Sequence, residues 1–136
     1  RAAQIAVFRA EIDKAKKDFG GESWEVSAAL LKLRTFLSQV GQHEQAEAVA
    51  RDVLRLREKA RPEDVATWKA RSELGEVLTK RGLFTEAGPQ LLSAHEGILQ
   101  RRDKIKPGDT AYIAPSLKRL VAFYEATAQP AKAAEW

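Results

Sequence analysis

Apolar side chains recur along this chain at intervals of three and four residues, the spacing that places them on one face of a helix. The clearest apolar stripes are Leu30, Leu33 and Leu37, then Leu74, Val77 and Leu78, and then Leu117, Leu120 and Tyr124. None of these segments shows the strict alternation of apolar and polar residues that is typical of a half-buried strand. The pattern therefore predicts an all-α protein.

The three stripes belong to one unit that is repeated along the chain. Three sets of residues mark equivalent positions: Leu33, Leu74 and Leu120; Gly41, Gly82 and Ala128; and Ala46, Ala87 and Ala133. Within each set the first offset is 41 residues and the second is 46, so the last copy follows an insertion of five residues. Turn-like segments at 20–23, 61–64 and 106–110 separate the copies, because their Gly and Pro residues interrupt helices.

A second apolar stripe follows each of the first two after a short turn. Its residues are Ala46, Ala50, Val53 and Leu54 in one copy, and Ala87, Leu91, Ala94 and Ile98 in the next. The small side chains allow close approach, and the turns at 41–44 and 82–85 are short, so each unit is predicted to be an antiparallel helix pair. Thr85 is the predicted N-cap of the later second helix.

The predicted organisation is a single repeat domain over residues 1–136. It comprises an unpaired second helix over 1–19, complete repeats over 24–61 and 64–105, and a truncated repeat over 111–136. This gives about six helices, with 131–136 as a short stub of a further one. Because the sequence lacks Met and begins at Arg1, we expect it to be a segment of a longer protein.

These markers resemble those of tetratricopeptide repeats. The residues that carry the resemblance are Leu33, Leu37, Gly41, Ala46 and Val53 in the first copy, and Leu74, Gly75, Leu78, Gly82, Phe84, Ala87 and Ala94 in the second. In the third copy Leu120, Tyr124 and Ala133 match, whereas Ala128 stands where the family carries glycine, which leaves the geometry of that turn open. The 41-residue spacing and the segment 86–91 are similar to the long repeats of kinesin light chains.

The last third of the chain also resembles the repeat region that follows the kinase domain in bacterial serine/threonine protein kinases. The segments concerned are 95–99, 119–126 and 133–136. The tetratricopeptide resemblance implies a right-handed solenoid of antiparallel helix pairs, in which the first helices line a concave groove. None of the kinase motifs themselves, such as His-Arg-Asp or Asp-Phe-Gly, occurs in these residues.

By register, the exposed face of the predicted first helices carries the candidate peptide-binding residues. They are Leu31, Thr35 and Gln39 in the first copy, Lys69, Ser72, Glu76 and Lys80 in the second, and Lys118 and Ala122 in the third. The three lysines suit a peptide carboxylate or an acidic side chain, and Leu31 and Ala122 suit an apolar one. A solvated helix face is the alternative interpretation. Since the sequence contains no Asn, we do not expect an asparagine-based clamp for a terminal carboxylate.

The composition argues against catalysis. There is no Cys, and the two histidines, His43 and His95, have no partner at metal-ligand spacing on the same helix face. Carboxylate pairs such as Glu44 and Glu47 are typical of solvated helices. We therefore expect no enzymatic activity in this segment, and neither a cofactor nor a metal.

The net charge of +4 raises nucleic-acid binding as an alternative. The two basic runs lie over 51–61 and 101–106, toward the ends of predicted second helices, where the helix dipole favours cations. Acidic residues interrupt both runs and no aromatic residues interleave to stack bases, so we favour the dipole interpretation. Trp24 and Trp68, near the joints between copies, are expected to pack between units.

Self-association is the other alternative, because Ile5, Val7 and Phe8 at one end and Trp136 at the other predict apolar end faces. The expected function is nevertheless a scaffold module that binds a protein or peptide, in a bacterial signalling protein such as a serine/threonine kinase. No apolar run is long enough to span a bilayer, so no membrane partner is expected. We expect a cytoplasmic location, with an extracytoplasmic part of a membrane-anchored parent as the alternative.

Overall fold

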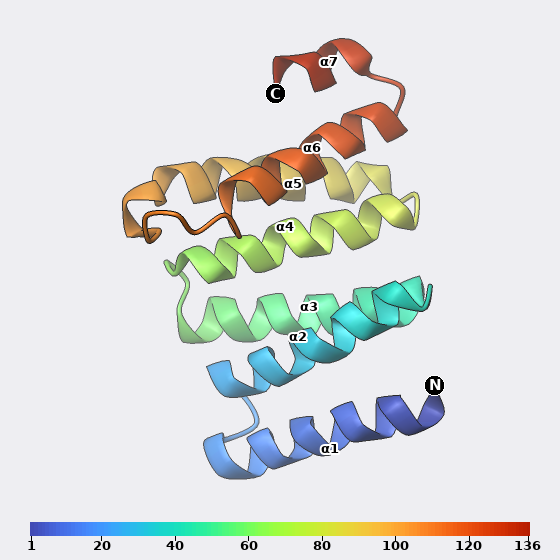
Figure 1. The fold of residues 1–136 in the computed structure, drawn as a ribbon, viewed down its shortest axis with the longest axis vertical. Coiled ribbons are helices and arrows are strands. Elements are labelled where there is room, and N and C mark those ends of the chain that lie inside the picture. Colours follow the sequence, from blue (N-terminus) through green and yellow to red (C-terminus); the bar gives the residue numbers. More distant parts are fainter. The chain divides into compact units, whose positions relative to one another are not determined.

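The computed structural model describes residues 1–136, apart from the side chain of Pro130, and is all-α as predicted (Figure 1). The α-helices are α1 (Ala2–Phe19), α2 (Trp24–Gln39), α3 (His43–Ala60), α4 (Val65–Lys80), α5 (Phe84–Gln100), α6 (Ile113–Ala126) and α7 (Pro130–Glu135). A short 3₁₀ helix, η1 (Arg102–Lys104), lies between α5 and α6. No strand occurs among the described residues, and the predicted stub forms the six-residue helix α7.

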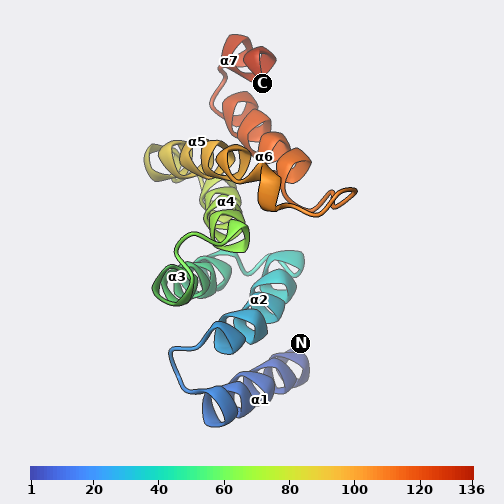
Figure 2. The ribbon, with the colours of Figure 1, turned by 90° about the vertical axis from the view of Figure 1, so that its left-hand side faces the viewer.

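The chain divides into two compact units, Arg1–Pro62 (unit 1) and Glu63–Trp136 (unit 2). The boundary between them along the chain falls within the predicted joint at 61–64. In unit 1, α2 packs against both α1 and α3; in unit 2, α6 packs against α4, α5 and α7, and α5 also packs against α4. Consecutive helices within each unit run in opposite directions (Figures 1 and 2). This packing of neighbouring helices agrees with a helical repeat.

The bounds of the helices follow the repeat offsets seen in the sequence. Both α1 and α3 have 18 residues, and α3 begins 41 residues after α1. Both α2 and α4 have 16 residues, and α4 is likewise displaced by 41 residues. The end of α6 lies 46 residues after the end of α4, and the start of α7 lies 46 residues after the start of α5. Helix α1 therefore has the register of a second helix of the repeat.

The same turn follows the first helix in all three copies. Gly41 and Gly82 have φ angles of 79° and 75°, and Ala128 adopts the same left-handed region at 58°. The N–H groups of Gln42, Leu83 and Gln129 donate to the carbonyl oxygens of Leu37, Leu78 and Tyr124 at 2.9, 2.9 and 2.8 Å, respectively. This bond across six residues is the one that closes a Schellman cap. The alanine in the third copy thus keeps the turn that glycine makes in the other two.

Two helices that follow the joints begin at side-chain caps. Ser23 Oγ accepts a hydrogen bond from the N–H of Val26 at 3.3 Å, and Asp64 accepts one from the N–H of Ala66 at 2.9 Å. The prediction that Thr85 caps α5 is wrong, since Leu83 is the N-cap and Thr85 lies in the first turn. The chain enters α5 directly from the Gly82 turn, which leaves no room for a separate capping residue.

The leucine markers of the repeat and two of its three alanine markers lie in the core. Leu33, Leu74 and Leu120 are buried, as are Ala46 and Ala87 in the first turns of α3 and α5, whereas Ala133 is half-buried. Among the described residues, every helix falls short of the length or the hydropathy that crossing a membrane requires.

Candidate functional site

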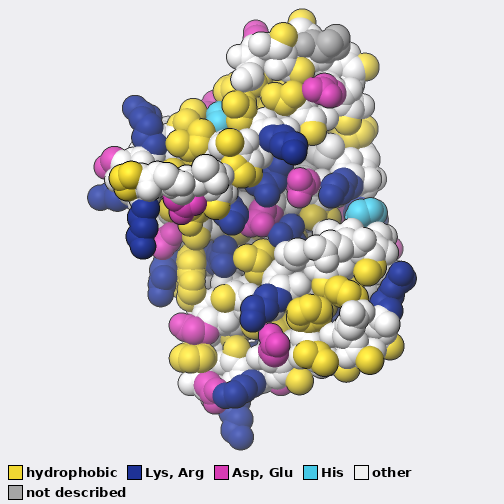
Figure 3. Space-filling view, viewed as in Figure 1, with side chains coloured by type: hydrophobic (Ala, Val, Ile, Leu, Met, Phe, Trp, Pro, Cys, Tyr) yellow, Lys and Arg dark blue, Asp and Glu magenta, His cyan; other side chains and the backbone are white. Residues whose placement is uncertain are grey.

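Unit 1 carries a depression of about 500 Å³ between α1 and α2, which we call the apolar depression. Its lining residues are Phe8, Ala28, Leu31, Lys32, Thr35, Phe36 and Gln39. All but Phe8 lie on α2 at helical spacing, and the rings of Phe8 and Phe36 pack with centroids 5.4 Å apart. Figure 3 shows apolar side chains gathered over the part of the surface formed by α1 and α2.

The polar groups on its rim differ in their availability. Thr35 Oγ1 donates to the carbonyl oxygen of Leu31 at 3.0 Å and accepts from Arg34 Nη2 at 3.2 Å. Lys32 Nζ lies 3.6 Å from the carboxylate of Glu11. The exposed amide of Gln39 has no side-chain partner among the described residues. Gln39 is therefore the group that has both a donor and an acceptor free for a bound peptide backbone.

Unit 2 carries a depression of about 460 Å³ between α4 and α6, which we call the basic depression. Its lining residues are Glu76, Thr110, Ala114, Pro115, Lys118, Arg119 and Ala122. Lys118 is exposed and forms no ion pair with any described residue. Arg119 is held by two groups of α4, because Nη1 donates to Ser72 Oγ at 3.3 Å and Nε lies 3.6 Å from Glu76 Oε2. Glu76 therefore offsets the charge of Arg119, and the charge of Lys118 remains.

Six of the nine predicted binding residues line these two depressions. The apolar depression brings together Leu31, Thr35 and Gln39, and the basic depression brings together Glu76, Lys118 and Ala122. Lys69 is half-buried, with its Nζ 5.6 Å from the centre of the Tyr112 ring, and Lys80 is exposed at the end of α4. Neither lysine is among the lining residues of these two depressions.

The prediction that Ser72 is exposed is wrong. Ser72 is fully buried, because α6 packs against α4 and Arg119 donates to the Ser72 hydroxyl. Phe8, Phe36 and Arg119 line the depressions although they were not among the predicted residues. Phe8 was assigned to an end face, and Arg119 lies one position beyond the face selected by register, so periodicity along one helix did not identify either residue.

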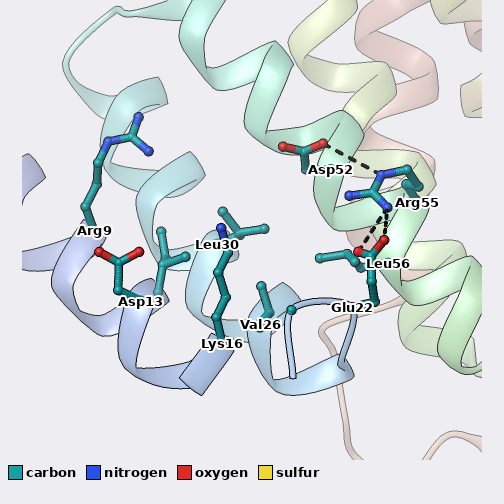
Figure 4. Close-up of a pocket in the computed structure, with 11 residues that line it drawn as sticks. Arg9, Asp13, Lys16, Glu22, Val26, Leu30, Asp52, Arg55 and Leu56 are labelled. Atoms are coloured by element: carbon teal, nitrogen blue, oxygen red, sulfur yellow. Dashed lines mark hydrogen bonds and ion pairs between the residues drawn. The ribbon is translucent and has the colours of Figure 1, made fainter. Parts of the chain in front are cut away.

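A third depression, of about 400 Å³, lies in unit 1 between α1, α2 and α3 and was also missed (Figure 4). Its lining residues are Arg9, Ile12, Asp13, Lys16, Gly21, Glu22, Val26, Leu30, Asp52, Arg55 and Leu56. Arg55 Nη1 lies 3.1 Å from Glu22 Oε1, and Arg55 Nε lies 3.9 Å from Asp52 Oδ1. The hydrogen bond from Arg55 lowers the pKa of Glu22, with further lowering from the charges of Arg55 and Lys59.

The charges of this third depression balance, since three cations face three acids. Its apolar residues Ile12, Val26, Leu30 and Leu56 are already buried by the packing of the unit. A ligand would therefore gain little from either charge or apolar contact there. Its lining residues lie at 9–30 and at 52–56, on three different helices and a loop, so periodicity along one helix could not have predicted it.

His95 lies in a buried pair with Ser116 rather than in an accessible site. Its Nδ1 is 2.7 Å from Ser116 Oγ, and its ring packs edge-on against Trp136 with centroids 5.5 Å apart. Ser116 Oγ also donates to the carbonyl oxygen of Ile113 at 2.9 Å, so His95 must carry its proton on Nδ1 to donate to Ser116. Because Ser116 is fully buried, a substrate cannot reach its hydroxyl. Burial lowers the pKa of His95, and Glu96 partly opposes that shift.

The described residues contain no group of three or more side chains placed to hold a metal ion. His43 is half-buried at the turn between α2 and α3, and its Nδ1 has no hydrogen-bond partner. The apolar depression and the basic depression offer a ligand apolar contact, the amide of Gln39 and the ammonium of Lys118.

The arginines of the basic runs bind groups of their own units. Arg57 Nε donates to Ser27 Oγ at 3.1 Å, and the guanidinium groups of Arg57 and Arg61 lie 4.7 and 4.4 Å from the ring centre of Trp24. In unit 2 the guanidinium of Arg101 lies 4.4 Å from the ring centre of Trp68 and forms an ion pair with Glu63. Each indole is thus a packing platform for arginines, which reduces the number of cations available to a nucleic acid.

The face of the molecule in Figure 3 shows cations and acids interspersed rather than gathered into a patch of one sign. Comparison with known proteins adds no assignment to this geometry: no protein-family model matches the chain, and no curated protein matches it significantly.

Proposed function

We propose that this chain is a non-catalytic binding module for proteins or peptides, built as a right-handed solenoid of tetratricopeptide-like helix pairs. The repeated turn and the repeated helix bounds support a repeat. The helix ends and the capping hydrogen bonds recur at the same offsets of 41 and 46 residues, which is not expected of unrelated helices. In such an array the first helices present an extended surface to a partner. A regulatory or recruiting role in a bacterial signalling protein, such as a serine/threonine kinase, and a cytoplasmic location belong to the same proposal.

The observation that carries the proposal is the position of the two depressions on the exposed side of the first helices. Leu31, Thr35 and Gln39 recur on α2 at intervals of four residues and converge with Phe8 on one depression. Lys118 and Ala122 recur on α6 in the same way and converge with Glu76 of α4 on the other. Small depressions with few polar groups suit single side chains of a short peptide.

The two depressions would bind different side chains. The apolar depression offers Leu31, Phe8 and Phe36 to an aliphatic or aromatic side chain, and the Gln39 amide to the adjacent peptide bond. The basic depression offers a lysine beside small apolar residues. Selectivity would then come from one anchor in each unit, rather than from a large buried area.

A random twelve-residue peptide library selected on the 136-residue chain tests this proposal. Selected peptides should shift the amide signals of residues 28–39 or 114–122 in ¹⁵N NMR spectra. The variants Leu31→Glu and Lys118→Glu should each weaken peptides that bind their own depression by about tenfold or more. The matched control Lys17→Glu changes an exposed lysine of α1 and should leave affinity unchanged. Selected peptides that shift only signals outside both depressions would contradict the proposal.

Self-association is a second candidate, favoured by the exposed face of α1. Ile5 and Phe8 are half-buried, but Val7 remains 59% exposed on the other side of the helix. Its neighbours there, Ala3, Ala6 and Ala10, are also exposed, so this stretch of α1 is apolar on the outside as well. Sedimentation velocity over a concentration series should then show association that Val7→Ser removes; a monomer at all concentrations would exclude this candidate.

A further inference from the structure

We propose that the basic depression of unit 2 selects an acidic side chain next to an apolar residue in the bound peptide. This inference rests on the proposed peptide-binding function and adds the chemistry of the partner. Lys118 and Arg119 of α6 and Glu76 of α4 are its charged lining residues. Two cations and one acid leave an excess of one positive charge at the surface of this depression.

The arrangement of these charges places the excess on Lys118. The side chain of Arg119 is only 14% exposed, and its hydrogen bond to Ser72 and its ion pair with Glu76 hold it against α4. Its Nε atom is buried and lies too far from Glu76, at 3.6 Å, for a hydrogen bond. Arg119 therefore binds Glu76 mainly through charge, and Glu76 is not free to neutralise Lys118. A carboxylate placed beside Lys118 would interact with an exposed ammonium whose charge no described acid offsets.

The uncharged part of the lining is apolar except for Thr110. Ala114, Pro115 and Ala122 lie on α6, and Thr110 lies in the loop before it. These residues offer apolar contact to a side chain next to the acid. The expected ligand is a peptide with Asp or Glu followed or preceded by an apolar residue.

The corresponding position in unit 1 provides an internal comparison. Leu31 of α2 and Lys118 of α6 have the same register position, because they are separated by the two repeat offsets of 41 and 46 residues. In unit 1 this position is apolar, and the nearby Lys32 lies 3.6 Å from Glu11. The preference for an acid should therefore reside in unit 2 and should be removed when Lys118 is replaced by leucine.

A peptide is a better occupant than a nucleic acid. A phosphate backbone needs several cations along its path, whereas this depression has a single uncompensated lysine and an acid on its wall. No aromatic ring lines it to stack a base. Binding of an oligonucleotide to this face is an outcome that the experiment below distinguishes.

The experiment compares peptides selected from the twelve-residue library on the wild-type chain with peptides selected on Lys118→Leu. We expect Asp and Glu to be enriched beside apolar residues on the wild type but not on the variant. A selected acidic peptide should bind Lys118→Glu at least about tenfold more weakly, and its affinity should fall as salt increases. Lys106→Glu makes the same charge change in the exposed loop before α6 and should retain the affinity. Circular dichroism of all variants checks that each is folded.

The outcomes separate this inference from the function on which it rests. Peptides that bind residues 114–122 but carry no excess of acids, or that bind Lys118→Leu equally well, overturn the acid preference and leave peptide binding intact. A failure to select any peptide overturns both. A defined single-stranded oligonucleotide that binds with a Lys118-dependent signal, where acidic peptides do not, would also overturn the inference.

Discussion

The indole of Trp68 on α4 lies directly on Gly97 of α5. A Cβ atom added to Gly97 would lie only 2.2 Å from Cε3 of the Trp68 ring, so this position has no space for a side chain. The equivalent residues of the preceding copy, 41 residues earlier, are Ser27 and Leu56, both of which are buried. In the later copy the first helix carries the large residue and the second helix carries the small one. In the preceding copy the sizes are reversed, and either arrangement keeps the two helices of a pair close.

We expect Gly97→Ala to lower the free energy of unfolding by about 1–3 kcal/mol, because the new methyl group must displace the Trp68 ring. Urea denaturation followed by circular dichroism measures the change. Gly21→Ala is the matched control, because no atom lies within 4 Å of the added Cβ, and its effect should stay within about 0.5 kcal/mol. In a Trp68→Ser background the cost of Gly97→Ala should shrink; an unchanged cost would show that the ring is not the obstacle.

Ala128→Gly should stabilise the chain by about 0.5–1 kcal/mol. Ala128 has a φ of 58°, in the left-handed region where the Cβ of alanine is sterically crowded. Glycine has no Cβ and adopts this region without that cost. The reverse change in the equivalent turn, Gly41→Ala, should destabilise by a similar amount, since no neighbouring atom would meet the added Cβ and only the backbone conformation matters. Thermal melts of the two variants measure the change in stability that each substitution causes. A loss of stability in Ala128→Gly would be evidence against the left-handed turn.

Leu74→Ala should lower the free energy of unfolding by about 2–5 kcal/mol, because Leu74 is 2% exposed and its removal leaves a cavity in the core of unit 2. Leu83→Ala removes the same atoms from a residue that is 40% exposed and should cost less than about 1 kcal/mol. Chemical denaturation of the two variants compares them directly. Equal effects would mean that the repeat register, which assigns Leu74 to the core, is incorrect.

The buried His95 should make stability depend on pH on the acidic side of neutrality. Burial lowers the pKa of His95 below its ordinary value of 6.5, so the unfolded chain binds its proton more tightly than the folded chain. This contribution to stability is fully present above about pH 6.5 and is lost as the pH falls through the lowered pKa. Urea midpoints at pH 7.5 and pH 5 should therefore differ more in the wild type than in His95→Gln. An identical difference in both proteins would assign the pH dependence to other groups.

The features that depend on neighbours along the chain could be predicted from the order of the amino acids alone. Helical type follows from the spacing of residues such as Leu33 and Leu37, and the turns at Gly41 and Gly82 follow from the preference of glycine for left-handed conformations. The offsets of 41 and 46 residues then fixed which positions are equivalent. Six of the nine predicted binding residues line the depressions for the same reason, since the buried core residues of a helix determine which of its faces stays exposed.

The packing of the helices, by contrast, determines which parts of those faces remain open and which side chains from other helices line the depressions. Ser72 has the periodicity of an exposed residue, but the packing of α6 on α4 buries it beneath Arg119. Phe8 joins Leu31 because α1 lies beside α2. Ala128 keeps a glycine-like turn because the helices on either side of it determine its conformation. Periodicity describes one helix at a time, whereas burial and the lining of a depression depend on the distances between atoms of different helices.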